Sequence, residues 1–214
     1  MSLAAPAEAR RAWIIDRLDP LDETPPDPAK VKADFAVNAQ FLPVDPTAWK
    51  LSAVLVPLVE RPDGLTVLLT TRPETMRNHA GQIAFPGGRS DPGETPAQTA
   101  LREAFEEIGL PPDQVSLAGQ STPCRTGSNF LIIPVVGFVP PDLPLTPNPG
   151  EVKDIFETPL QFLMDPANHE VRHVETPAGK SYSYHAMTWE DRFIWGATAR
   201  LLRLLHERLF GPAA

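Results

Sequence analysis

The feature that most constrains this chain is a predicted helix over residues 96–108 that carries three glutamates. Thr95 and Pro96 are typical of a helix start, because threonine is a good N-cap and proline is favoured at the first helical position. Gly109 is suited to end the helix. At about 100° per residue, such a helix has two chemically different faces. One face groups Glu103, Glu106 and Glu107, and the other carries Leu101, Ala104, Phe105 and Ile108.

The glutamate face needs a cationic partner. Like charges at i, i+3 and i+4 repel one another on a helix, and Arg102 is the only cation within residues 96–108. A solvated acidic face is the common alternative for two glutamates. Three converging carboxylates instead favour Mg²⁺ or Mn²⁺, ions that bridge substrate phosphates and activate water. The preceding turn at residues 86–88 and the loop through Gly93 can bring backbone N–H groups towards an anionic substrate.

Hydrophobic periodicity predicts an α/β fold around this helix. Strands are expected at 50–60, 65–72, 115–120, 131–139 and 151–156, a weaker hairpin at 170–186, and helices at 7–18 and 189–209. A short apolar run at 82–85 leads into the turn at 86–88. Strands first, with one helix in the middle and one at the end, indicate a mixed sheet with helices packed on it. The 26 prolines predict many stiff loops. We divide the chain into an N-terminal helix and Pro-rich wrapping segment (1–34) and one folded domain (35–214).

Charge and cysteine content exclude several classes of function. The formal charge is −8, which disfavours a broad nucleic-acid-binding surface. Cys124 is the only cysteine, so no intrachain disulfide can form, and this suits a reducing cytoplasm. The most apolar run, residues 130–139, is too short to span a membrane. We therefore expect a soluble cytoplasmic protein with no nucleic-acid or membrane partner, and the sequence leaves a homodimer open.

Residues 88–110 resemble a complete Nudix box. The box has the form G-x5-E-x7-R-E-U-x-E-E-x-G-U, where U is apolar. The chain has Gly88, then Glu94, then the run Arg102-Glu103-Ala104-Phe105-Glu106-Glu107-Ile108-Gly109-Leu110. The resemblance implies the Nudix α/β/α sandwich and hydrolysis of a nucleoside diphosphate linked to another group.

The resemblance to the Nudix box also implies roles for individual residues. Glu103, Glu106 and Glu107 would be ligands of Mg²⁺ or Mn²⁺, with Glu103 or a neighbouring glutamate activating water. Arg102 would pair with a carboxylate and fix its orientation, so the expected catalytic set is Glu103, Glu106 and Arg102. Glu94 would support the loop or an outer-shell ion. Further acids from outside the box are expected from Glu151 or Glu157.

Residues 68–88 are similar to the additional signature of coenzyme A pyrophosphatases, LLTxR[SA]x3Rx3Gx3FPGG. The chain carries Leu68-Leu69-Thr70-Thr71-Arg72, Arg77, Gly81 and Phe85-Pro86-Gly87-Gly88, and departs from the signature at Pro73. Guanidinium groups bind phosphate oxygens bidentately, which suits Arg72 and Arg77 to a pyrophosphate site. His79, Gly87 and Gly88 complete the expected substrate-binding set.

The leading hypothesis is therefore a metal-dependent hydrolase of coenzyme A or its derivatives. The products would be 3′,5′-ADP and 4′-phosphopantetheine or its acylated form. A second hypothesis keeps the Nudix chemistry but changes the substrate to ADP-ribose, a nucleotide sugar or a nucleoside triphosphate. A third is a Nudix-fold module that senses a nucleotide without cleaving it, although this chain retains all three box glutamates.

Overall fold

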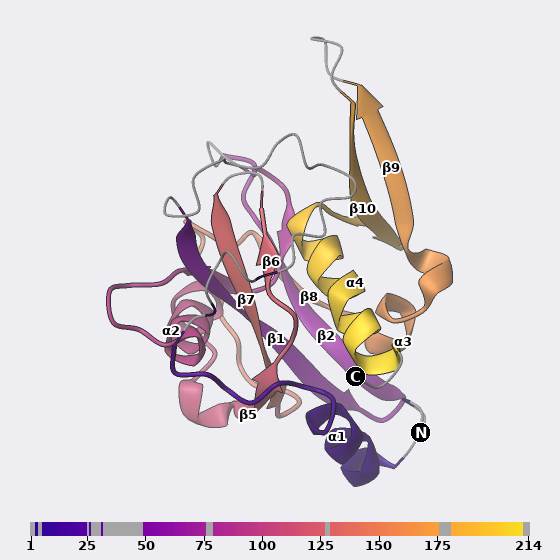
Figure 1. Cartoon of the computed structure of the whole chain (residues 1–214). Coiled ribbons are helices and arrows are strands. Elements are labelled where there is room, and N and C mark those ends of the chain that lie inside the picture. The colour runs from indigo at the N-terminus through magenta and orange to yellow at the C-terminus, as the bar shows by residue number, and fades with distance from the viewer. Residues whose placement is uncertain are drawn as a thin grey trace.

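The computed structural model describes residues 3, 6–24, 26, 31, 49–75, 79–126, 129–175 and 181–211. Most of the predicted Pro-rich segment, and Arg77, lie outside these residues. Eight strands of the described chain form a mixed sheet with the central order β3-β2-β1-β7-β5 (Figure 1). Its strands are β1 (Lys50–Arg61), β2 (Gly64–Thr71), β3 (Ile83–Ala84), β4 (Gly87–Arg89), β5 (Ser116–Gln120), β6 (Cys124–Arg125), β7 (Phe130–Val139) and β8 (Asp154–Pro159).

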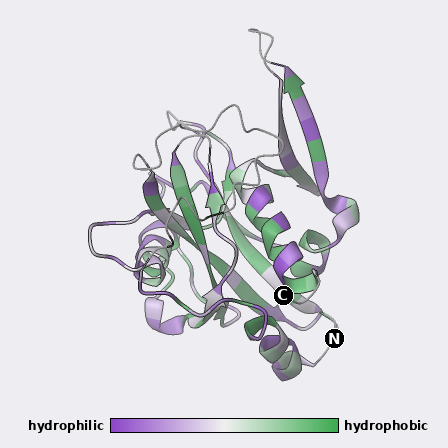
Figure 2. Cartoon of the chain, in the orientation of Figure 1, coloured by the Kyte–Doolittle hydropathy of each residue, from purple (hydrophilic) through white to green (hydrophobic). Residues whose placement is uncertain are grey.

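Helices cover both faces of this sheet. The helices are α1 (Ala7–Ile15), α2 (Pro96–Ile108), the short α3 (Leu160–Leu163) and α4 (Ala197–Phe210). Strand β1 is parallel to β7 and is buried on both sides, which explains its nearly continuous apolar sequence. Its alternate residues Ala53, Leu55 and Val59 pack with α2, whereas Val54, Val56 and Leu58 pack with α1 and α4. The expected α/β/α sandwich with a mixed sheet and a C-terminal helix is confirmed, and Figure 2 shows its central strands as predominantly hydrophobic.

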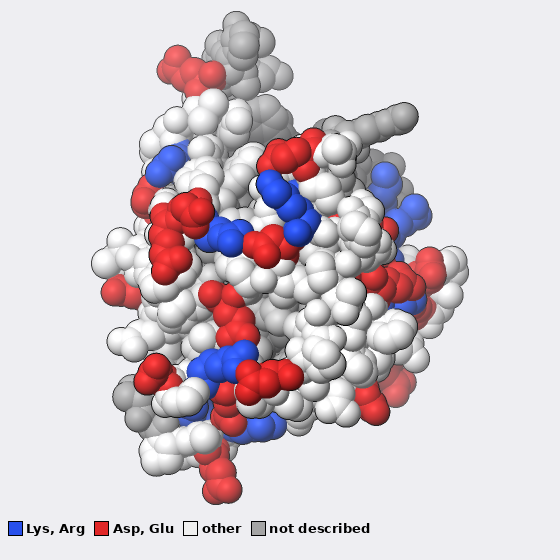
Figure 3. Space-filling view, turned by 180° about the vertical axis from the view of Figure 1, so that it is seen from behind, with Lys and Arg blue, Asp and Glu red and all other residues white. Residues whose placement is uncertain are grey.

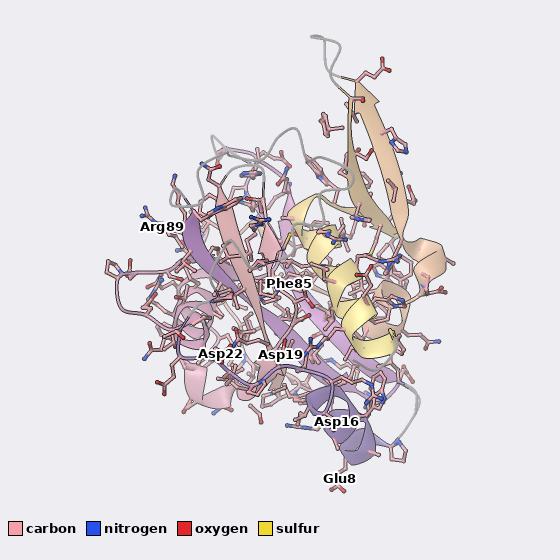
Figure 4. All side chains as sticks on the ribbon, viewed as in Figure 1. Glu8, Asp16, Asp19, Asp22, Phe85 and Arg89 are labelled. Atoms are coloured by element: carbon pink, nitrogen blue, oxygen red, sulfur yellow. The ribbon has the colours of Figure 1, made fainter. Side chains whose placement is uncertain are left out.

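The segment that leads into the carboxylate helix fills a gap inside the sheet. Strands β1 and β2 pair only near their hairpin, from Leu58↔Val67 to Arg61↔Gly64. Beyond it they diverge, with β4 pairing to β1 and β3 pairing to β2. Phe85, between β3 and β4, is buried on the α4 side, whereas Arg89 at the end of β4 is exposed (Figure 4). Gly87 and Gly88 are thereby fixed on a strand against β1.

Helix α2 has the bounds that its flanking residues predict. The hydroxyl of Thr95 accepts the Gln98 N–H (3.2 Å) and the Gln98 side chain accepts the Thr95 N–H (2.8 Å), which makes a capping box. Gly109 adopts the left-handed conformation (φ 67°) that ends the helix. The predicted apolar stripe is wrong at Phe105, whose residue exposure is 54%. The buried arc instead runs through Ala100, Ala104, Glu107 and Ile108.

The predicted helix at 189–209 begins too early. Residues 192–195 form β11 (Arg192–Trp195), which pairs antiparallel with β10 (Ser181–Trp189). Phe193, Ile194 and Trp195 are β-branched or aromatic residues that favour a strand, and Gly196 turns the chain (φ 66°) before α4 starts. Strand β9 (Glu170–Glu175) completes a second sheet in the order β11-β10-β9, so the predicted hairpin is confirmed. Strand β8 begins three residues later than expected.

The N-terminal helix is part of the main core. Trp13 and Ile14 of α1 are buried in the cluster that contains the α4 leucines. After α1, Asp19 forms an isolated bridge with Gln120 of β5 and an ion pair with Arg208 of α4 (Figure 4). Among the described residues, no helix is long and apolar enough to cross a membrane.

Candidate active site

Arg102 of α2 organises the acidic residues around it. Its Nε and Nη2 donate to the two carboxylate oxygens of Glu94 (2.7 and 3.0 Å), and its Nη1 donates to Glu103 (2.9 Å) and Glu106 (3.1 Å). Glu94 is held further by the Thr99 hydroxyl (2.9 Å). The hydrogen bonds from Arg102, the largest influence, lower the pKa of Glu94 to about 2. The i,i+4 pair with Glu106 is thus only one part of a wider network.

Glu103 lies directly under the Gly88 backbone. A Cβ atom at position 88 would stand 2.5 Å from the Glu103 carboxyl carbon, so a larger residue there would push this carboxylate out of its position. The Ser52 hydroxyl donates to the Gly88 carbonyl (2.6 Å) and helps to fix it. Burial raises the pKa of Glu103, and the charges of Glu106 and Glu151 act in the same direction against Arg102.

Glu107 is the most deeply buried of the three box glutamates. Its exposed fraction is 5%, and its carboxylate accepts the Gly87 N–H (3.1 Å). Burial raises its pKa to about 7, with Glu103 and Glu151 adding to the rise and Arg72 opposing it. The Gly87 backbone fits this closely against β1 because glycine has no Cβ atom. A Cβ there would stand 2.5 Å from the Ala53 carbonyl oxygen.

A loop from residues 144 to 152 is tied to the C-terminal end of α2. The N–H groups of Thr146 and Asn148 donate to the carbonyls of Ile108 (2.9 Å) and Glu107 (2.8 Å), which the helix itself leaves unpaired. Asn148 also accepts the N–H of Glu151 (3.0 Å). The Asn148 contacts were not predicted, although Asn-Pro-Gly is a recognisable turn signal. The loop brings Glu151 within electrostatic range of Glu103 and Glu107.

The second acid candidate, Glu157, lies in a different ion-pair network. It accepts two hydrogen bonds from Arg61 (2.7 and 3.1 Å) and one from Thr66 (2.5 Å). Arg61 also pairs with Asp142 (2.6 Å). Glu157 therefore has its partners at the β1–β2 hairpin rather than at the box helix.

The predicted substrate-binding residues are only partly described. Arg72 follows β2, where its N–H donates to the Gln82 carbonyl (2.9 Å). Its side-chain Nε is buried and has no hydrogen-bond partner among the described residues. His79 is exposed, has a left-handed backbone (φ 58°) and contacts the Gln82 side chain through Nδ1 (2.8 Å). Arg77 lies outside the described residues.

The acidic cluster fits a divalent cation in its donor chemistry and its charge. Burial raises the pKa of both Glu103 and Glu107, so a nearby cation would stabilise the ionised carboxylates. In the described part of the chain, no three Asp, Glu, His or Cys side chains are arranged to hold an ion as they stand. Glu106 is engaged with Arg102 and Glu107 with the Gly87 N–H.

Comparisons with known proteins identify the family. The chain matches the NUDIX domain over residues 49–176. The Nudix hydrolase NudL of Photorhabdus laumondii, described as uncharacterized, is 38% identical over 184 residues, covering 83% of this chain and 97% of that protein. NudL of Yersinia pestis is 37% identical over 159 residues, covering 74% and 79%.

A solved structure of lower similarity has the same family name. RenU, a Nudix hydrolase from M. smegmatis, is 27% identical and covers 52% of this chain and 71% of its own, with a TM-score of 0.44. The assignment rests on the domain match and the NudL relatives, which extend over most of the chain. The chain therefore belongs to the Nudix family.

Proposed function

We propose that this Nudix hydrolase cleaves the diphosphate linkage of coenzyme A or its derivatives, releasing 3′,5′-ADP and 4′-phosphopantetheine or its acylated form. The observation that carries the proposal is Arg72, a cation whose charge reaches Glu107 and whose buried Nε lacks a partner among the described residues. A guanidinium N–H group without a protein partner is suited to a phosphate oxygen. Coenzyme A offers both a diphosphate and a 3′-phosphate.

In this proposal, Glu103, Glu106 and Glu107 would hold Mg²⁺ or Mn²⁺. When bound, such an ion supplies charge neutralisation for the diphosphate and lowers the pKa of water. Glu103 or Glu106 orients the attacking water and receives its proton. Arg102 keeps the carboxylates of Glu94 and Glu103 in place through its hydrogen bonds.

Other chain residues have supporting roles in the proposal. Glu151 provides an additional carboxylate from the loop that is bonded to the end of α2. Gly87 and Gly88 allow the backbone to approach both the glutamates and the substrate. Arg77 is proposed as a further substrate contact on the basis of the signature, and His79 on the basis of its place in the same segment of the sequence.

Product analysis tests the proposal. The protein is incubated with coenzyme A, dephospho-coenzyme A, ADP-ribose and a nucleoside triphosphate, with and without Mg²⁺. We expect coenzyme A to be split into the two phosphate-bearing products, with no orthophosphate. A hydrogen bond to a charged group contributes about 1.5–3 kcal/mol, so dephospho-coenzyme A should be a poorer substrate by about ten- to a hundredfold if Arg72 reads the 3′-phosphate.

The variant Arg72→Ala should then reduce the difference in turnover between coenzyme A and dephospho-coenzyme A. Arg203→Ala on α4, which removes a partly exposed arginine from another part of the chain, is the control and should leave the ratio of the two turnover rates unchanged. Equal turnover of both substrates by the unmodified protein would show that the 3′-phosphate is not read. Turnover of ADP-ribose alone would refute the coenzyme A assignment.

A further inference from the structure

Lys153 lies at the edge of the candidate site but belongs neither to the Nudix box nor to the preceding signature. Its backbone N–H donates to the carbonyl of Thr71 (2.7 Å), so it is held next to the end of β2, where Arg72 follows. The preceding Val152 is buried in the cluster that also contains the α2 residues Ala104 and Ile108. Lys153 is therefore fixed by its backbone between Arg72 and the acidic end of α2.

The sheet has two faces at this point, and they have different partners. Thr71 and Asp154 both bind Arg192 of β11, through the Thr71 hydroxyl (3.4 Å) and the Asp154 carboxylate (2.8 Å). Arg72 directly follows Thr71 and Lys153 directly precedes Asp154, so both cations lie one residue beyond the paired ends of β2 and β8. Leu68 of β2 and Ile155 of β8 pack with the α2 cluster, and the charge of Arg72 reaches Glu107 of α2.

The backbone bond from Lys153 to Thr71 brings two positively charged residues, Arg72 and Lys153, to neighbouring positions in the structure. Among the described residues, Lys153 forms one ion pair, in which its Nζ lies 3.6 Å from the Glu74 carboxylate. Its side chain is 56% exposed and that of Glu74 is 67% exposed, so this pair contributes little to folding. Glu74 also lies against Gly81, where an added Cβ would stand 2.7 Å from its carboxylate oxygen. The two cations are thus available to an incoming anion.

We infer that Lys153, together with Arg72, binds a phosphate group of the substrate, and that Glu74 competes with the substrate for the Lys153 ammonium group. This inference rests on the proposed function, because it requires an anionic diphosphate substrate. Such a substrate must approach a cluster that already holds Glu103, Glu106, Glu107 and Glu151, so a cation at the rim offsets the repulsion. Lys153 is then a determinant of substrate affinity.

Steady-state kinetics of the full chain with coenzyme A and Mg²⁺ test the inference, using Lys153→Gln, Glu74→Gln and the double variant. Lys153→Gln should raise KM by about three- to tenfold with kcat within about twofold. Glu74→Gln should lower KM by about two- to threefold, because the ammonium group loses its competitor. In the Lys153→Gln background, Glu74→Gln should have no further effect.

The opposite changes in KM expected for Lys153→Gln and Glu74→Gln separate this inference from a structural role of the ion pair. If the pair merely held the two segments together, both single variants would raise KM. That result, or an unchanged KM in Lys153→Gln, would overturn the inference. The matched control is the exposed pair Arg203–Glu207 on α4 (2.8 Å), in which neither Arg203→Gln nor Glu207→Gln should change KM.

The test does not depend on coenzyme A being the substrate. If the unmodified protein splits ADP-ribose but not coenzyme A, the proposed function is wrong and the same KM comparison is made with ADP-ribose. If it splits neither, the binding of coenzyme A is measured by calorimetry in EDTA. The fold-changes given above for KM are then expected for Kd. No binding, or equal binding by the unmodified protein and Lys153→Gln, would refute the inference.

Discussion

Glu107 is expected to destabilise the metal-free protein at neutral and alkaline pH. The residue is 5% exposed, and burial is the main reason that its pKa rises from 4.5 to about 7. A shift of this size corresponds to a ceiling of about 3 kcal/mol of unfavourable free energy for the ionised form. Glu107→Gln removes the charge and retains an oxygen that can accept the Gly87 N–H, so we expect the variant to be more stable by about 1–3 kcal/mol at pH 8.

The sign of the pH dependence follows from proton binding. Between about pH 4.5 and 7 the folded protein keeps a proton on Glu107 that the unfolded chain has already released. The contribution of this group to stability therefore falls as the pH rises through that window, and the loss is complete above about pH 7. At pH 4.5 or below, the unmodified protein and Glu107→Gln should differ little.

The assay is urea unfolding of both proteins in EDTA at several pH values, with the difference in unfolding free energy plotted against pH. A second series with Mg²⁺ should stabilise the unmodified protein more than the variant, because an ion bound only by the folded state adds stability. Glu106→Gln is the matched control, since Glu106 is 52% exposed and should give a small difference at every pH. A difference for Glu107→Gln that is the same at pH 5 and pH 8 would refute the reasoning.

Two further substitutions test the remaining contacts of the box. Arg102 lowers the pKa of Glu94 to about 2, so this pair adds stability that is fully present above about pH 4.5 and is lost as the pH falls towards 2. Glu94→Gln should cost about 1–2 kcal/mol at pH 7 by urea unfolding and little near pH 2, and an equal cost at both pH values would contradict this. Gly88→Ala should displace the Glu103 carboxyl and lower turnover by at least about tenfold, since a Cβ there would stand 2.5 Å from it. Gly150→Ala is its control, because the added Cβ there meets only the Asn148 side chain at 3.5 Å, and similar turnover of the two variants would refute the steric argument.

The parts of the fold that depend on local signals could be predicted from the sequence. Thr95, Pro96 and Gly109 set the bounds of α2 through contacts within the helix and its caps, so neighbouring elements hardly matter. The start of α4 depends on β10, because residues 192–195 form a strand only where β10 offers a partner. Periodicity cannot distinguish these residues from a first helical turn. The short strands β3 and β4 likewise exist only because β1 and β2 diverge around them.

The charge distribution across the faces of the molecule also depends on tertiary structure. The formal charge of −8 predicts an acidic protein but no pattern. On the face seen in Figure 3, acidic and basic side chains lie next to one another, without one broad basic patch. Arg61, for example, pairs with Glu157 and Asp142, residues far from it in sequence. This pairing removes Glu157 from the candidate site, which spacing alone could not indicate.

The three box glutamates differ because of what the sheet places over them. In sequence, Glu103, Glu106 and Glu107 are equivalent members of one helix face. In the structure, the strand that carries Gly87 and Gly88 covers Glu107 and Glu103, whereas Glu106 stays half exposed beside Arg102. An ionised carboxylate is least stable where it is most buried, so Glu107 and Glu103 gain most from a cation. Glu106, whose side chain is 52% exposed, is the best solvated of the three and gains least, so we expect metal affinity to fall more in Glu107→Gln than in Glu106→Gln.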